Sequence, residues 1–161
     1  TLTTSSAASD VYKRQIIGEG PERINLELLA KKLGIANKVR FLGYIQEEAI
    51  LYDYLRNADI FALSSITEGF PRVLYEAMAM RLPIVTTDIG GIPFILSNQE
   101  NALLVKPGNP DQLAESFNLV IEDNNLRKKM IRKANQTIEE VFKRMDGSQI
   151  SKLLLKHNTT T

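Results

Sequence analysis

Two carboxylates, Glu68 and Glu76, flank a turn that leads into a helix. The apolar run at residues 60–63 gives way to hydroxyl residues, Gly69 follows the first glutamate, and an apolar pattern with helical spacing starts at Pro71. Proline suits the first position of a helix, because the N–H group that it lacks would have no partner there. The N–H groups of a first helical turn point outward at the positive end of the helix dipole. The sequence therefore predicts an anion site here, most naturally for phosphate.

Short apolar runs that alternate with helical patterns must position this turn. Strands are expected at residues 16–18, 39–44, 60–63, 83–87 and 102–105. The first helix carries Ile24, Leu28, Leu29 and Leu33, and further helices are expected at residues 47–57, from Pro71, from Pro110 after the capping residue Asn109, and at residues 125–142. This alternation predicts an α/β fold, a Rossmann-like parallel sheet with flanking helices.

Ligands of such sheets bind beyond the carboxyl ends of the strands. Gly18, Gly43, Glu68 and Gly90 all lie at or beyond the carboxyl ends of predicted strands, so we expect them to share one crevice.

Composition excludes several classes of function. The chain has 161 residues, of which 43% are hydrophobic and 24% are charged, as in an ordinary globular domain. Its formal net charge of +1 gives no reason to expect a nucleic-acid partner. No cysteine is present, which fits a reducing compartment, and no apolar run approaches the ~20 residues that span a bilayer. We expect a cytoplasmic protein. The basic run at residues 127–133 could bring it to the inner face of the membrane, although charge runs are more often solvated helix faces.

The catalytic machinery of several enzyme classes is absent from the sequence. There is no Ser-His-Asp set, and the single histidine, His157, lies in a polar tail. No Asp-x-Asp pair is present to hold a divalent metal against a nucleotide diphosphate, so we expect no metal and no other cofactor. The turn with Gly18 and Gly20 fails the dinucleotide pattern G-x-G-x-x-G, because Arg23 occupies the third position. What remains is a nucleotide site made of backbone amides and carboxylates.

Seven residues separate Glu68 from Glu76, and this E-x7-E segment resembles that of retaining GT-B glycosyltransferases, especially glycosyltransferase family 4. Four further blocks, at residues 17–22, 39–43, 82–93 and 101–110, follow the order and spacing of that family. The similarity covers residues 15–143. Five blocks in order are far more specific than one motif.

The resemblance implies a role for each residue of the site. Glu76 would accept hydrogen bonds from the ribose hydroxyls of a nucleotide-sugar donor, and Glu68, as the catalytic residue, would hold a hydroxyl of the donor sugar. The sugar and the diphosphate would meet the amides of Gly69, Phe70, Arg72 and Val73. The backbone of Tyr44 and Ile45 would line the base, while Gly18 and Gly20 are either donor-site or plain turn glycines.

The sequence departs from the family at three positions and at its beginning. Phe94 stands where a glutamate is usual, and Arg72 and Tyr75 replace smaller or aliphatic residues. The first strand and helix of the donor domain, which carry an Arg and a Lys, and the whole acceptor-binding domain are not found. In the doubly wound order the lost strand would lie between those at residues 16–18 and 60–63. These two must then pair directly, leave unpaired edges or recruit another chain.

We therefore expect three segments. Residues 1–14 are a non-native or disordered lead, residues 15–145 a nucleotide-sugar-binding Rossmann-like domain, and residues 146–161 a C-terminal helix or tail. The resemblance implies the donor-binding fragment of a retaining glycosyltransferase of the hexosyltransferase type, which would be inactive alone. A non-catalytic nucleotide-sugar-binding fragment and a nucleotide-sugar epimerase of the same architecture remain as alternatives.

Overall fold

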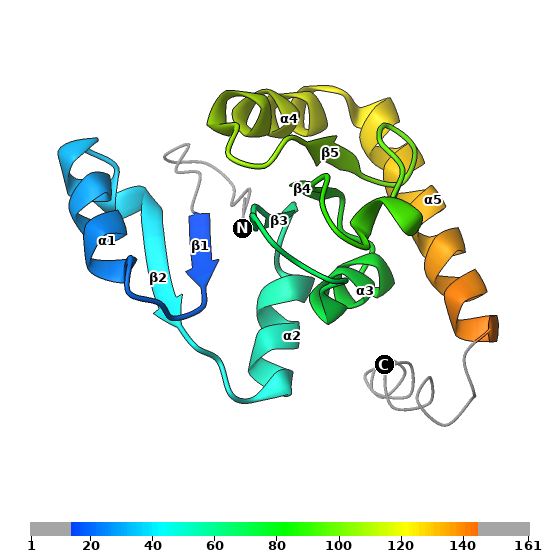
Figure 1. The fold of residues 1–161 in the computed structure, drawn as a ribbon, viewed down its shortest axis with the longest axis horizontal. Coiled ribbons are helices and arrows are strands. Elements are labelled where there is room, and N and C mark those ends of the chain that lie inside the picture. Colours follow the sequence, from blue (N-terminus) through cyan, green and yellow to red (C-terminus); the bar gives the residue numbers. More distant parts are fainter. Residues whose placement is uncertain (1–13, 145–161) are drawn as a thin grey trace, which may run out of the picture. The chain divides into compact units, whose positions relative to one another are not determined.

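A computed structural model describes residues 14–144, which form two compact units divided after Asp59 (Figure 1). The expected lead at residues 1–14, except for Arg14, and the expected tail at residues 146–161 lie outside the described residues. Both units contain parallel strands joined by helices. The predicted Rossmann-like α/β class, with parallel sheets and flanking helices, is confirmed.

The first unit contains β1 (Arg14–Ile17), α1 (Arg23–Lys32), the 3-10 turn η1 (Ala36–Lys38), β2 (Val39–Gly43) and α2 (Glu48–Arg56). β1 and β2 are parallel neighbours, and a register shift between Ile16 and Ile17 brings Ile17 opposite Gly43. The guanidinium of Arg23, the first residue of α1, pairs with Glu19 at 2.9 Å and with Glu27 at 3.0 Å. Because β1 and β2 are parallel, their carboxyl ends lie at the same edge of this sheet.

The apolar residues of α1 are largely exposed within this structure. Ala30 is the only buried residue of the helix, whereas Ile24 and Leu28 are 70% and 56% exposed. The periodicity of the sequence predicts the helix correctly, but its apolar side chains are not covered by residues 14–144.

The second unit contains a three-stranded parallel sheet in the order β3-β4-β5, formed by Phe61–Leu63, Ile84–Thr87 and Leu103–Val105. Its helical elements are α3 (Arg72–Ala79), the 3-10 turn η2 (Ile92–Phe94), α4 (Pro110–Glu122) and α5 (Asn124–Arg144). The core between the sheet and α4 and α5 consists of Val85, Leu103, Val105, Val120 and Met130. β4 is the central strand, and all four of its residues are buried, as expected for a parallel strand covered on both faces.

The two sheets share no strand in the described part of the chain. β1 pairs only with β2, and β3 pairs only with β4. Whether the strands at residues 16–18 and 60–63 pair directly, leave unpaired edges or recruit another chain stays a prediction.

Helix starts agree with the sequence at α4 and differ by one residue at α3. Asn109 caps α4 through its Oδ1, which accepts from the N–H of Gln112 at 3.0 Å, and Pro110 is the first helical residue as predicted. Pro71 was expected at the first helical position of α3, but this was wrong. Its extended ψ of 124° makes it the capping residue, and the helix begins at Arg72.

α3 ends in a left-handed residue that is not glycine. The N–H of Leu82 donates to the carbonyl of Ala77 and that of Arg81 to Met78, both at 3.0 Å, which is the Schellman arrangement. Arg81 has φ of +57°, a conformation that costs a residue with a side chain about 1–2 kcal/mol. This helix end is therefore strained at Arg81.

The substitution Arg81→Gly should raise the free energy of unfolding by about 0.5–1 kcal/mol. Relief of the left-handed strain exceeds the entropy that glycine adds to the unfolded chain, about 0.4–1 kcal/mol. Urea denaturation of the two proteins measures the difference. Lys128→Gly, in the right-handed interior of α5, is the contrasting control and should lower stability by about 1 kcal/mol. Equal destabilisation by both substitutions would contradict the assignment of strain.

Candidate functional site

Two loops meet at the carboxyl end of the second sheet. One follows β3 and contains Glu68 and Gly69, and the other follows β4 and contains Gly90 and Gly91. The N–H of Gly91 donates to the carbonyl of Gly69 at 2.7 Å. A direct backbone bond therefore joins the turn before α3 to the turn after β4.

The paired glycines allow this close approach. Gly90 has φ of +54°, and a Cβ built on it would overlap the carbonyl oxygen of Glu68. A Cβ on Gly91 would lie 2.9 Å from the carbonyl oxygen of Gly69. Any side chain at either position would push the Glu68 loop away from the sheet, so both glycines are positioning residues. Sequence reasoning gave Gly91 no role in the site, although a Gly-Gly pair directly after a buried strand was a usable signal.

The carboxylate of Glu68 is held by its own loop. Its Oε1 accepts a hydrogen bond from Ser65 Oγ at 2.8 Å, and the side chain is half-buried. The carbonyl of Ser65 in turn accepts from Thr87 Oγ1 at 2.7 Å. Thr87 is 2% exposed, so a buried hydroxyl on the central strand anchors the residue that orients Glu68. Sequence reasoning missed Thr87 because its partner Ser65 is 22 residues away, in the loop after a different strand. It also missed Ser65, although this residue stands only three positions before Glu68.

The two threonines of β4 give a matched test of this anchor. Thr87→Val should lower the free energy of unfolding by about 1–2 kcal/mol, because it leaves the carbonyl of Ser65 without its donor. Thr86 Oγ1 is equally buried but has no hydrogen-bond partner, so Thr86→Val should be neutral or stabilising. Thermal or chemical denaturation of both variants measures the contrast. Equal effects of the two substitutions would show that the hydroxyl of Thr87 does not hold the loop.

The start of α3 offers a group of backbone donors. Within residues 14–144 the N–H groups of Gly69, Phe70, Arg72 and Val73 have no hydrogen-bond acceptor. They precede or begin the first turn of α3, at the positive end of its dipole. These four amides are therefore available to an anion, and the anion site itself stays a prediction.

The side chains around these amides differ in exposure. Glu76 is half-buried in α3, and Arg72 is exposed at its start. The rings of Phe70 and Tyr75 are in contact at a tilt of 36°, with centroids 4.5 Å apart, and burial raises the pKa of the Tyr75 phenol. Tyr75 therefore packs on the turn, which accounts for one of the departures from the family pattern. Phe94 is 88% exposed at the end of η2, so it fills none of the interior.

The remaining predicted residues lie in the first unit. Gly18, with φ of +137°, donates its N–H to the carbonyl of Gly43 at 2.9 Å, so these two strand ends meet. The carbonyl of Gly20 accepts from the N–H of Arg23 at 3.2 Å, as in a turn that begins a helix. Tyr44 is exposed and Ile45 is half-buried after β2. The four residues predicted to share a crevice are thus seen as two pairs, Gly18 with Gly43 and Glu68 with Gly90, each within its own unit.

The described residues hold neither a cluster of metal ligands nor a helix that could cross a membrane. Within residues 14–144, no three His, Cys, Asp or Glu side chains gather as a metal ion would need. In the same range, no helix combines the length and the apolar character needed to cross a membrane.

A Rossmann-like fold with a glycine-lined, amide-rich turn between two carboxylates is typical of nucleotide-binding proteins. The chain belongs to the family described as glycosyl transferases group 1, whose model matches residues 5–137. It is 33% identical over 130 residues to a glycosyltransferase of Methanocaldococcus jannaschii, covering 81% of this chain and 33% of that protein. It is 32% identical over 131 residues to N-acetyl-alpha-D-glucosaminyl L-malate synthase of Bacillus anthracis, covering 81% and 34%. The chain therefore spans about a third of the length of these relatives.

Solved structures agree with this family. HepE of Anabaena in complex with UDP has a TM-score of 0.72 and 26% identity, covering 90% of this chain and 40% of that one. The C-terminal domain of a group 1 glycosyl transferase from Francisella tularensis has a TM-score of 0.68 and 28% identity, covering 74% and 62%. The fold is thus that of one half of a GT-B glycosyltransferase. The glycosyltransferase relatives do not favour the epimerase alternative.

Proposed function

We propose that this chain is the donor-binding part of a retaining glycosyltransferase of family 4, of the hexosyltransferase type. The observation that carries the proposal is the Glu68 loop, which is bonded to Gly91 beside four unpaired amides at the start of α3. HepE of Anabaena has been solved with UDP and with UDP-glucose, which supports a nucleotide-sugar donor.

The donor would be bound through charge and backbone donors. The diphosphate would accept hydrogen bonds from the amides of Gly69, Phe70, Arg72 and Val73, and Glu76 would accept from the ribose hydroxyls. Glu68, held by Ser65, would accept from a hydroxyl of the sugar. Tyr44 and Ile45 would line the base, and the turn with Gly18 and Gly20 would complete the donor site.

The reaction of the intact protein would need no covalent intermediate on this chain. The bond between the anomeric carbon and the diphosphate breaks, the acceptor oxygen attacks the same face, and its proton moves to the departing phosphate oxygen. Glu68, Glu76 and the amides contribute positioning and electrostatic stabilisation. The acceptor-binding half, and a contact with the inner face of the membrane, belong to the longer parent that the proposal assumes.

Calorimetry on the 161-residue chain tests this proposal. We expect measurable binding of at least one of uridine, guanosine and adenosine diphosphate in the absence of metal, with no sugar transfer when a nucleotide sugar and acceptors are added. Absence of binding to all three nucleotides would overturn the donor-site assignment. Turnover by the chain alone would overturn its description as a donor-binding fragment.

A further inference from the structure

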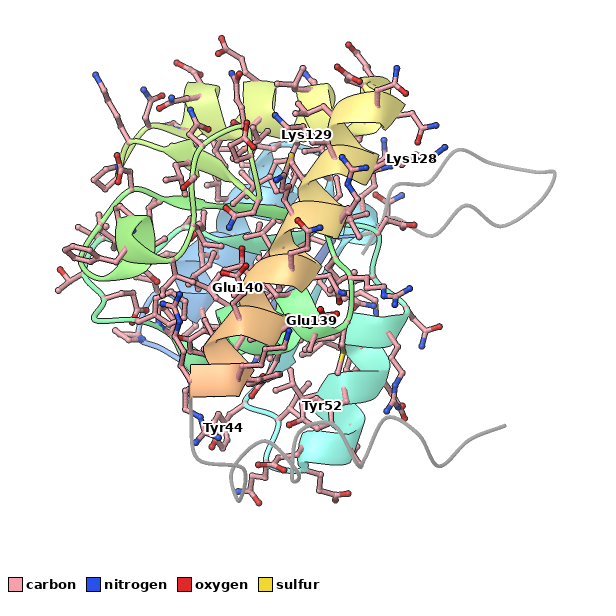
Figure 2. All side chains as sticks on the ribbon, turned by 90° about the vertical axis from the view of Figure 1, so that its right-hand side faces the viewer. Tyr44, Tyr52, Lys128, Lys129, Glu139 and Glu140 are labelled. Carbon is pink, nitrogen blue, oxygen red and sulfur yellow. The ribbon has the colours of Figure 1, made fainter. Side chains whose placement is uncertain are left out.

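An open groove of about 490 Å³ lies between the end of α3 and α5 in the second unit. Its polar lining is formed by Arg81, Lys128, Arg132, Asn135, Gln136 and Glu139. Figure 2 shows α5 along this side of the molecule, with Lys128 toward one end and Glu139 nearer the other. None of the residues assigned to the donor lines the groove, so it is a separate feature of the fold.

The groove carries an excess of positive charge. Three cations, Arg81, Lys128 and Arg132, line it together with one carboxylate, that of Glu139. That carboxylate already accepts a hydrogen bond from Asn135 Nδ2 at 2.8 Å. Within residues 14–144 the three cationic side chains make neither an ion pair nor a hydrogen bond. The groove therefore holds three cationic groups whose charges are not neutralised in the described structure.

Tertiary structure divides the basic run of α5 into two parts. Lys129 Nζ lies 2.6 Å from Glu100 Oε1 and also donates to the carbonyl of Gln99 at 3.1 Å. This hydrogen bond lowers the pKa of the Glu100 carboxyl, so Lys129 has a partner within the protein. Lys128 and Arg132 lie one helical turn apart and line the groove instead. The basic residues of α5 therefore differ in their surroundings, because Lys129 is paired and Lys128 and Arg132 line the groove.

Arg81 is a further cation of the groove, and its spacing from the basic run of α5 in the sequence did not predict that they lie together. It occupies the left-handed position at the end of α3, where glycine would fit without strain. Residues held in strained backbone conformations cluster at functional sites. Here the side chain of Arg81, at the end of α3, supplies one positive charge to the groove. The other two come from Lys128 and Arg132 on α5.

We propose that this groove binds a phosphate group. The guanidinium groups of Arg81 and Arg132 have the planar fork that matches phosphate oxygens, Lys128 supplies a further charge, and the amide of Gln136 can donate. A lipid headgroup and a soluble phosphate ester present the same chemistry to these side chains. The proposal goes beyond donor binding and does not depend on it.

Two probes and three variants test the groove in the 161-residue chain. Inorganic phosphate is titrated by calorimetry, and co-sedimentation compares vesicles of phosphatidylglycerol and phosphatidylcholine with vesicles of phosphatidylcholine alone. Arg81→Gly and Arg132→Gln should each weaken the observed binding about tenfold, because each removes one charge-assisted contact. Lys133→Gln makes the same change in net charge on α5 outside the groove and should leave binding unchanged.

The two arms identify the source of the phosphate. Binding of free phosphate that Arg81→Gly weakens supports a soluble ligand, and vesicle binding with the same dependence supports a headgroup. No binding in either arm overturns the proposal, as does an equal loss with Lys133→Gln, which would indicate diffuse charge. Arg81→Gly is expected to be at least as stable as the parent, so lost binding would not reflect unfolding. Should it fail to fold, Arg132→Gln decides the outcome alone.

Discussion

Replacing Gly90 by alanine should lower the free energy of unfolding by about 3 kcal/mol and abolish binding of a nucleotide diphosphate. The left-handed φ of +54° costs a side chain about 1–2 kcal/mol, and the overlap of the new Cβ with the carbonyl of Glu68 adds about 1–3 kcal/mol. Binding is lost because the same displacement moves Glu68 and the neighbouring amides. Denaturation and calorimetry on the purified variant measure the two effects.

Gly108→Ala is the matched control for this prediction. Gly108 has φ of +70°, but nothing lies within 4 Å of a Cβ built on it. It should therefore show the conformational cost of about 1–2 kcal/mol without the overlap, and nucleotide binding should be retained. If both variants lost the same stability and both kept binding, the contact between the two loops would not position the site.

Substitutions of Glu68 and Glu76 should change the affinities for different ligands. Glu76→Gln should weaken binding of both a nucleotide diphosphate and its nucleotide sugar by about tenfold to a hundredfold, since hydrogen bonds to a charged acceptor contribute about 1.5–3 kcal/mol. Glu68→Gln should weaken the nucleotide sugar alone, because its assigned partner is a sugar hydroxyl. Calorimetry with the two ligands gives four affinities that test the assignment.

Glu115→Gln, at an exposed position on α4, controls for the loss of one negative charge. It should leave both affinities unchanged. Equal losses of nucleotide diphosphate affinity in Glu68→Gln and Glu76→Gln would remove the distinction between a sugar contact and a ribose contact. Unchanged affinities in Glu76→Gln would return this residue to an ordinary half-buried helix position.

Local patterns in the sequence were sufficient for most elements. The alternation of apolar runs and helical spacing predicts the strands and helices of both units, and Asn109 with Pro110 fixes the start of α4. The start of α3 was misplaced by one residue, because proline fits both the capping and the first helical position until its ψ is known. These features depend on neighbours along the chain, which a sequence displays directly.

Contacts between distant residues were decided only by the tertiary structure. The sequence by itself determined the parallel α/β class, the turn between Glu68 and Glu76 and the family resemblance that the comparisons confirm at the level of group 1 glycosyl transferases. It did not determine that Thr87 anchors Ser65 or that Gly91 bonds to Gly69. It also did not place Arg81 opposite the cations of α5. Each of these contacts joins segments that follow different strands or helices, so its distance depends on how the elements pack and not on their spacing in the chain.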